Sequence, residues 1–191
     1  MSRFPRYLLL AALPALLATG CAQGEDSSSA TTPPVVSGEV TPPPGSVSPA
    51  TTVDPCQTLT AQQVVAVLGY SATSPQSNAV PGDAYALAAC TWGGADQGTY
   101  LALQVFTPGA VDDPVSVLLG AAGEAPTPYP SLPQGQTWNL GFLPGGGGQG
   151  YTITWVEGEE QVALSLLGSD ISAQQQQALQ TAAGEVAAAL G

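Results

Sequence analysis

The side chains in this chain that can carry out chemistry are three cysteines and 14 carboxylates, because there is no histidine and there are only two basic residues. The basic residues, Arg3 and Arg6, both stand near the N-terminus. Hydrolases of the Ser-His-Asp or Cys-His type require an imidazole, and a phosphate-binding P-loop requires its lysine. The composition therefore excludes these classes for the part of the chain beyond Arg6.

The carboxylates form two local clusters, Asp112 with Asp113, and Glu157 with Glu159 and Glu160. A pair of carboxylates is sufficient for glycoside hydrolysis, and carboxylate oxygens also suit calcium. However, the first cluster lies at an expected helix start and the second at an expected hairpin tip, where acids are usually solvated. We therefore predict no catalytic residue, no cofactor and no metal site. A carboxylate-based hydrolase is the least favoured alternative.

The first cysteine, Cys21, stands at the end of a predicted export signal. Residues 1–20 combine two arginines with a short apolar run, Tyr7–Ala18, and two small residues before the cysteine. This is the pattern of a secretory signal peptide. The apolar run is shorter than the roughly 20 residues that a membrane-spanning helix needs.

The stretch LATGC, Leu17–Cys21, resembles the lipobox of bacterial lipoproteins. In that family the cysteine receives a diacylglyceryl thioether and becomes the first residue of the mature protein. The resemblance implies lipidation at Cys21, which would anchor the exported chain to the outer face of the cytoplasmic membrane. Two acyl chains anchor a protein stably, whereas one binds only marginally.

The other two cysteines, Cys56 and Cys90, remain as an even pair if Cys21 is lipidated. Disulfides persist in the oxidising compartment to which the signal would send the chain. We predict a disulfide between these residues, with two free buried thiols as the alternative. A metal site is less favoured, because two thiols without a histidine offer too few ligands.

The chain after the signal peptide divides into two parts. Residues 21–53 are rich in Pro, Ser and Thr and contain little to bury, which predicts a disordered tether. Residues 54–191 are long enough for a single globular domain with its own core. The tether would hold this domain away from the membrane.

Two helices are predicted at the ends of the domain from their capping boxes, Thr60 with Gln63 and Ser172 with Gln175. The first helix is expected to end at Gly69. The buried faces are predicted from the helical period. For the first helix they are Ala61, Val64, Val65 and Leu68, and for the last helix Leu179, Ala182, Ala183, Val186 and Leu190.

The strands are predicted from alternation of apolar and polar residues. The segments are 87–93, 100–106, 137–142, 151–156 and 161–167, the last two joined by a four-residue loop, 157–160. A short helix is expected over 112–122, with Asp113 as its N-cap. The fold class is therefore α+β, with an antiparallel sheet of about five strands packed by an N-terminal and a C-terminal helix and joined by one disulfide.

The domain also resembles a family of uncharacterised actinobacterial lipoproteins. The resemblance is carried by DPC at Asp54–Cys56, by a helix ending in Leu68 and Gly69, and by CTW at Cys90–Trp92. It implies a lipid-anchored envelope domain with a Cys56–Cys90 bridge. The family has no agreed activity, so the resemblance implies a location and a fold but no chemistry.

The charge of the chain limits its partners. Formal net charge is -12, and beyond Arg6 there is no cation. Such a chain cannot neutralise phosphates, so nucleic acid is excluded as a partner, and an anionic membrane surface repels it. The lipid is then the membrane anchor, and the partner is an envelope protein, a glycan or a lipid. The sequence leaves the oligomeric state open.

Two non-enzymatic functions compete. The first is a binding module, for which Tyr151, Trp138 and Trp155 would supply an aromatic surface, although core positions are the preferred interpretation for all three. The second is a carrier of an apolar lipid or isoprenoid, held where the small residues of the last helix leave room. We favour the binding module.

Overall fold

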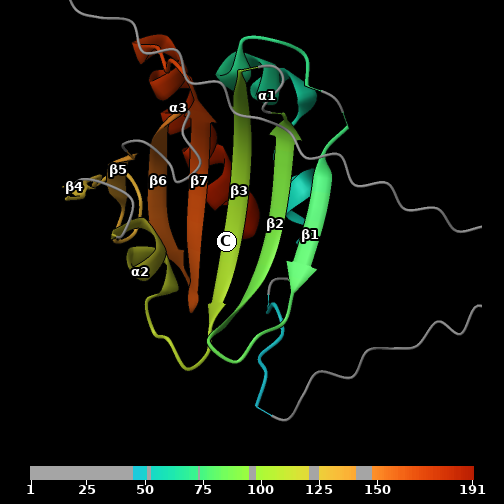
Figure 1. The fold of residues 1–191 in the computed structure, drawn as a ribbon, viewed down its shortest axis with the longest axis vertical. Helices are drawn as coiled ribbons and strands as arrows, with labels where there is room; N and C mark the ends of the chain where they lie inside the picture. The colour runs from blue at the N-terminus through green and yellow to red at the C-terminus, as the bar shows by residue number, and fades with distance from the viewer. Residues whose placement is uncertain (1–44, 51–52, 73, 95–97, 121–124, 141–147) are drawn as a thin grey trace, which may run out of the picture. The chain divides into compact units, whose positions relative to one another are not determined.

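The computed structural model describes residues 45–50, 53–72, 74–94, 98–120, 125–140 and 148–191. The predicted signal peptide, Cys21 and most of the predicted tether lie outside the described residues. The described part is an α+β domain built on a seven-stranded antiparallel sheet of order β1-β2-β3-β7-β6-β5-β4. Figure 1 shows the strands side by side in this order, with β4 at the left and β1 at the right.

The strands run over β1 (Gln76–Val80), β2 (Tyr85–Gly93), β3 (Thr99–Pro108), β4 (Thr127–Pro128), β5 (Gln136–Leu140), β6 (Gln149–Glu157) and β7 (Glu160–Gly168). The helices are the 3₁₀ helix η1 (Pro55–Gln57) and the α-helices α1 (Ala61–Leu68), α2 (Pro114–Gly120) and α3 (Ala173–Leu190). The α+β class, the terminal helices and the short helix α2 are confirmed.

The expected number of about five strands is too low, because the sequence patterns miss the two edge strands. All residues of β1 are exposed, and β4 has only two residues, so neither shows an apolar alternation. The loop between β6 and β7 is also shorter than expected. Glu157 pairs with Glu160, and only Gly158, at φ 61°, and Glu159 form the turn.

Helix α1 has the predicted ends. The Gln63 N–H donates to Thr60 Oγ1 at 3.3 Å, and the Thr60 N–H donates to Gln63 Oε1 at 2.6 Å. Gly69 closes the helix in the left-handed conformation, at φ 82°. Its buried face differs from the prediction: Val64, Val67 and Leu68 are buried, whereas two residues predicted to be buried, Ala61 and Val65, are exposed.

Helix α3 begins with the predicted capping box, in which the Gln175 N–H donates to Ser172 Oγ at 3.2 Å. Its buried residues are Leu179, Ala182, Ala183 and Val186, as predicted, and Leu190 is partly buried. The helix contacts α1, β6 and β7. The two alanines belong to the same packed core as the sheet residues, and this favours close packing over space for a carried lipid.

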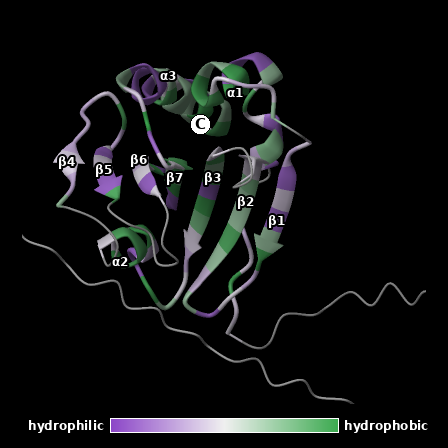
Figure 2. Ribbon diagram, turned by 45° about the horizontal axis from the view of Figure 1, so that its top comes forward, coloured by the Kyte–Doolittle hydropathy of each residue, from purple (hydrophilic) through white to green (hydrophobic). Residues whose placement is uncertain are grey.

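The two faces of the sheet are covered by different helices. Helices α1 and α3 pack against one face, where the main core lies (Figure 1). Helix α2 packs against the other face, where Val115 and Leu119 meet Phe106 and Ala163. In Figure 2 β2 is mostly hydrophobic and β3 carries bands of both kinds, whereas β1 is hydrophilic over most of its length.

Residues 45–50 belong to the predicted tether, yet they contact the domain. Val47 and Gly82 exchange backbone hydrogen bonds of 3.0 and 3.1 Å. Ser46 Oγ donates to Asp83 Oδ1 at 2.8 Å, and the Ala50 N–H donates to Thr107 Oγ1 at 2.9 Å. The backbone of an extended segment offers free donors and acceptors, and here Gly82 of the loop between β1 and β2 and Thr107 of β3 pair with them.

Candidate functional site

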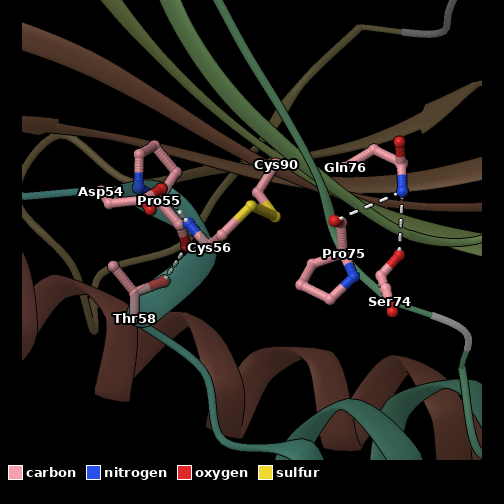
Figure 3. Close-up of a disulfide and its surroundings, with 8 residues drawn as sticks. All are labelled: Asp54, Pro55, Cys56, Thr58, Ser74, Pro75, Gln76 and Cys90. Carbon is pink, nitrogen blue, oxygen red and sulfur yellow. Dashed lines mark hydrogen bonds between the residues drawn. A yellow bond between two sulfur atoms is a disulfide. The ribbon is translucent and has the colours of Figure 1, made fainter.

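The disulfide predicted between Cys56 and Cys90 is present, with a Cα–Cα distance of 5.1 Å. Cys56 lies in η1, where its N–H donates to Asp54 Oδ1 at 2.9 Å. Cys90 lies in β2 and is fully buried. Figure 3 shows the bond between η1 on one side and Ser74, Pro75 and Gln76 on the other. The bond therefore fixes η1 to the sheet next to the start of β1.

A cavity of about 370 Å³, which we call the disulfide pocket, opens beside this bond. It is lined by Cys56, Leu59, Ala61, Val64, Val65, Ser71, Ala72, Ser74, Pro75 and Trp92. None of these side chains carries a charge, and most are apolar. The volume lies within the range of about 300–1,000 Å³ that is typical of small-molecule sites.

The walls of the disulfide pocket come from η1, from Leu59 and α1 after it, from β2, and from residues 71, 72, 74 and 75 before β1. Ala61 and Val65 are exposed because they face this pocket instead of the sheet. The side chain of Gln76 folds back on the segment before β1, where its Nε2 donates to the Ser74 carbonyl at 3.2 Å. Short-range contacts thus hold this segment, and a covalent bond holds η1.

The sequence patterns do not predict this pocket, although they contain one signal for it. Helix α1 has eight residues and packs on one side only. Its apolar face, formed by Ala61, Val64, Val65 and Leu68, is wider than such a contact can bury. An apolar face that is wider than the contact surface leaves some residues for another partner. The remaining walls have no local signature, because they meet only in the folded chain.

Two other cavities are smaller and more polar. One of about 100 Å³ lies between α2 and the strands β5 to β7, with Asp113, Gln134 and Gln161 among its lining residues. The other, of about 300 Å³, lies beside β5, β6 and the start of α3, with Asn139, Tyr151 and Gln176. Polar groups make up a larger share of the lining in both than in the disulfide pocket, so neither offers an equally apolar environment.

The aromatic surface considered for Tyr151, Trp138 and Trp155 is not present, because these side chains are only 8%, 4% and 2% exposed. Tyr151 and Trp155 face α1 and α3, whereas Trp138 lies on the opposite face of the sheet. Trp138 Nε1 donates to Thr154 Oγ1 at 3.1 Å. Gln180 Nε2 donates to Tyr151 Oη at 3.0 Å. Strand alternation turns Tyr151 and Trp155 into the main core, and Trp138 is buried on the other face of the sheet.

The acidic clusters have local structural partners. Asp113 caps α2, since its Oδ1 accepts the Ser116 N–H at 3.0 Å. Glu160 Oε1 accepts a hydrogen bond from the Thr107 hydroxyl at 3.0 Å. The backbone of Glu157 pairs with that of Glu160 across the hairpin. Within the described residues, no group of three or more Cys, Asp or Glu side chains is placed to hold a metal ion. The lining of the disulfide pocket includes no carboxylate.

The helices in the described part of the chain lack the combination of length and apolar character that a bilayer-spanning helix has. Comparison of the sequence with protein-family models and with curated proteins finds no match.

Proposed function

We propose that this protein is a lipid-anchored, non-enzymatic binding module on the outer face of the cytoplasmic membrane, and that it binds an apolar group of its ligand in the disulfide pocket. The location is supported by the export signal and by the lipobox resemblance at Cys21. The predicted tether between Cys21 and the domain would hold the pocket at a distance from the membrane surface, where it can meet a ligand.

The disulfide pocket is the observation that carries the binding function. It combines an apolar, uncharged lining with a volume of about 370 Å³. Cys56, in one wall, is covalently held to Cys90 in the sheet. A wall that is fixed before the ligand arrives loses little conformational entropy on binding, and this favours affinity.

The charge of the chain narrows the ligand class. All 14 acidic residues lie beyond Arg6, in the part of the chain that has no cation. Anionic ligands would be repelled over the screening distance of about 8 Å at physiological salt, whereas neutral and cationic ones would not. The ligand therefore carries an apolar group without a negative charge.

The binding function is tested with the full chain and the neutral apolar fluorophore N-phenyl-1-naphthylamine. Ala61 and Ala173 are both exposed alanines at the first position of a capped helix, but only Ala61 lines the disulfide pocket. Ala61→Trp should fill the pocket and weaken fluorophore binding about tenfold or more, which corresponds to about 1.4 kcal/mol. Ala173→Trp is the matched control and should bind as the parent does.

Two results would overturn this proposal. One is the absence of saturable fluorophore binding by the parent chain. The other is equal binding by the parent and by both tryptophan variants, which would place the fluorophore elsewhere.

A further inference from the structure

The outer edge of β1 pairs with no other strand among the described residues and lies next to the disulfide pocket, and the two together have the form of a site for an extended peptide. Strand β1 is the last strand of the sheet on its side and pairs only with β2 among the described strands. All five of its residues are exposed. An exposed edge presents unpaired backbone N–H and C=O groups to which another strand can add.

The two edges of the sheet differ in how they are protected. Natural edge strands are usually short, charged, bulged or interrupted by proline. At the opposite edge β4 meets this expectation, because it has only two residues and ends in Pro128. Strand β1 has five uncharged residues, QSNAV, and no proline. Prolines flank β1 at Pro75 and Pro81 but lie outside it, so within the described residues its edge is the less protected of the two.

The pocket lies at the beginning of β1, on the side of the sheet that carries α1. Ser74 and Pro75, which line the pocket, directly precede Gln76. Ser77 pairs with Cys90, whose disulfide partner Cys56 forms another wall. On this face β1 presents only the small side chains of Ser77 and Ala79, which leave room for the side chains of an added strand.

An added strand would lie about 4.8 Å beyond β1, with alternate side chains on the helix side of the sheet. Side chains on that side would pass over Ser77 and Ala79. One that projects past Gln76 would reach the disulfide pocket beside Pro75. Main-chain hydrogen bonds would then supply part of the affinity and the pocket would select one apolar side chain, as in other cases of strand addition.

We propose that the partner of this module is a protein segment that pairs with β1 as an extended strand, places an apolar side chain in the disulfide pocket and carries neutral or basic residues beside it. This inference rests on the proposed binding function and specifies its ligand. Charge complementarity favours a neutral or basic segment as the occupant. Strand β1 has no charged residue, and every charged side chain beyond Arg6 is acidic.

A second copy of the chain is the less favoured occupant of the edge. A β1–β1 contact would join only five residues from each copy, whereas stable interfaces use about 20–30 residues a side. A second copy would also bring another 14 acidic side chains and no cation beyond Arg6. A basic or neutral peptide pairs with the same five residues but avoids the repulsion between two acidic copies.

The test selects peptides against the full chain from a phage-displayed library of random 12-residue peptides. Enriched peptides should show apolar residues at every second position and an excess of Lys and Arg over Asp and Glu. The best peptide is then synthesised with single backbone N-methyl groups along its length. Affinity should fall about fivefold or more at alternate positions, where the N–H would face β1, and change little at the positions between them.

The edge itself is tested at Asn78, which is exposed and lies on the face away from the pocket. Asn78→Lys should weaken binding of the selected peptide about tenfold, because it adds a like charge to the edge. Asn78→Glu, the matched variant of opposite charge, should bind at least as tightly as the parent. Both should bind N-phenyl-1-naphthylamine normally, and Thr127→Lys on the opposite edge should bind the peptide normally.

The outcomes separate this inference from the proposed function. An N-methyl scan without alternation, or a library without enrichment, overturns strand addition even when the fluorophore binds in the pocket. Alternation without fluorophore binding overturns the pocket as the small-molecule site and leaves the edge as the binding element. A dimer in sedimentation that Asn78→Lys dissociates, with no peptide binding, assigns the edge to a second copy and overturns the peptide proposal.

Discussion

The Cys56–Cys90 disulfide joins η1 to the second strand of the sheet across a sequence separation of 34. Cross-linking a loop of this length removes conformational freedom from the unfolded chain, which corresponds to about 3–4 kcal/mol of stability in the chain-entropy model. The double variant Cys56→Ala, Cys90→Ala should lose about this much free energy of unfolding in urea titration.

The parent chain reduced with dithiothreitol is the control for this disulfide variant and should lose a similar amount. The variant should also bind the fluorophore more weakly, since the wall that contains Cys56 is no longer held. A loss of stability below about 1 kcal/mol in both measurements would contradict the role given to the bond.

Two of the three buried tryptophans, Trp138 and Trp155, differ in the surroundings of one atom. Trp138 Nε1 donates to Thr154 Oγ1, whereas Trp155 Nε1 is buried without a hydrogen-bond partner among the described residues. Replacing either ring by phenylalanine leaves a comparable cavity. Trp138→Phe additionally loses a hydrogen bond, whereas Trp155→Phe removes an unsatisfied donor. Trp138→Phe should therefore cost about 1 kcal/mol more than Trp155→Phe in thermal or urea unfolding, and the reverse order would contradict these hydrogen-bond assignments.

At the residue scale the sequence was informative wherever a local rule applied. Thr60 with Gln63 and Ser172 with Gln175 form the predicted capping boxes, because a cap depends only on residues three apart. The burial of Trp138 was harder to predict, since strand alternation separates two faces but does not tell whether both are covered. On the second face Trp138 is 4% exposed, and its Nε1 donates to Thr154 Oγ1 of the neighbouring strand.

At the element scale, glycine stabilises the end of one helix and destabilises the interior of another, as Gly69 in α1 and Gly184 in α3 show. Gly69 closes α1 at φ 82°, and an alanine there has space for its Cβ but a strained backbone. Gly184 is exposed within α3, at an ordinary helical position, and no atom lies within 4 Å of the place that an alanine Cβ would occupy. Gly69→Ala should lower the free energy of unfolding by about 1 kcal/mol, whereas Gly184→Ala should raise it by about 0.5–1 kcal/mol.

Urea titration of the two single variants measures both changes, and each serves as the control for the other. Destabilisation by both would show that α3 does not tolerate the extra methyl group at Gly184. Stabilisation by both would show that α1 does not require a left-handed residue at Gly69.

The elements that the sequence predicts and those that it misses differ in their surroundings. Strands β2, β3, β6 and β7 bury many of their side chains, so their apolar residues mark them clearly. Strand β1 is exposed throughout and forms through its backbone pairing with β2, which leaves no pattern in its side chains. The missed strand is also the one that we propose as a binding edge, because the same exposure makes it hard to predict and free to pair.

At the scale of the whole molecule, the disulfide pocket is a property of the fold and not of any segment. Cys56, Val65, Pro75 and Trp92 come from four places in the chain and share no spacing that a sequence motif could record. The sequence predicts the bond that holds one wall and the helix that forms another. It does not predict that the two leave a space between them, because that space depends on how the folded segments meet.

Membrane attachment of the whole molecule is proposed to depend on one sulfur atom. The apolar run Tyr7–Ala18 is shorter than a spanning helix. The acidic chain has no basic patch beyond Arg6 that could hold it to anionic lipids. Two acyl chains on Cys21 would supply stable attachment where these two features cannot.

The variant Cys21→Ser should therefore incorporate no labelled fatty acid, while the parent and the Cys56→Ala, Cys90→Ala variant should incorporate it. Mass spectrometry of the parent should give a chain that begins at Cys21 and carries the added glyceryl and acyl groups. Equal labelling of the serine variant, or a parent mass equal to that of the uncleaved and unmodified chain, would contradict lipidation. The disulfide pocket would then remain the proposed binding site, but its proposed place at the membrane would be lost, because that place rests on the lipid at Cys21.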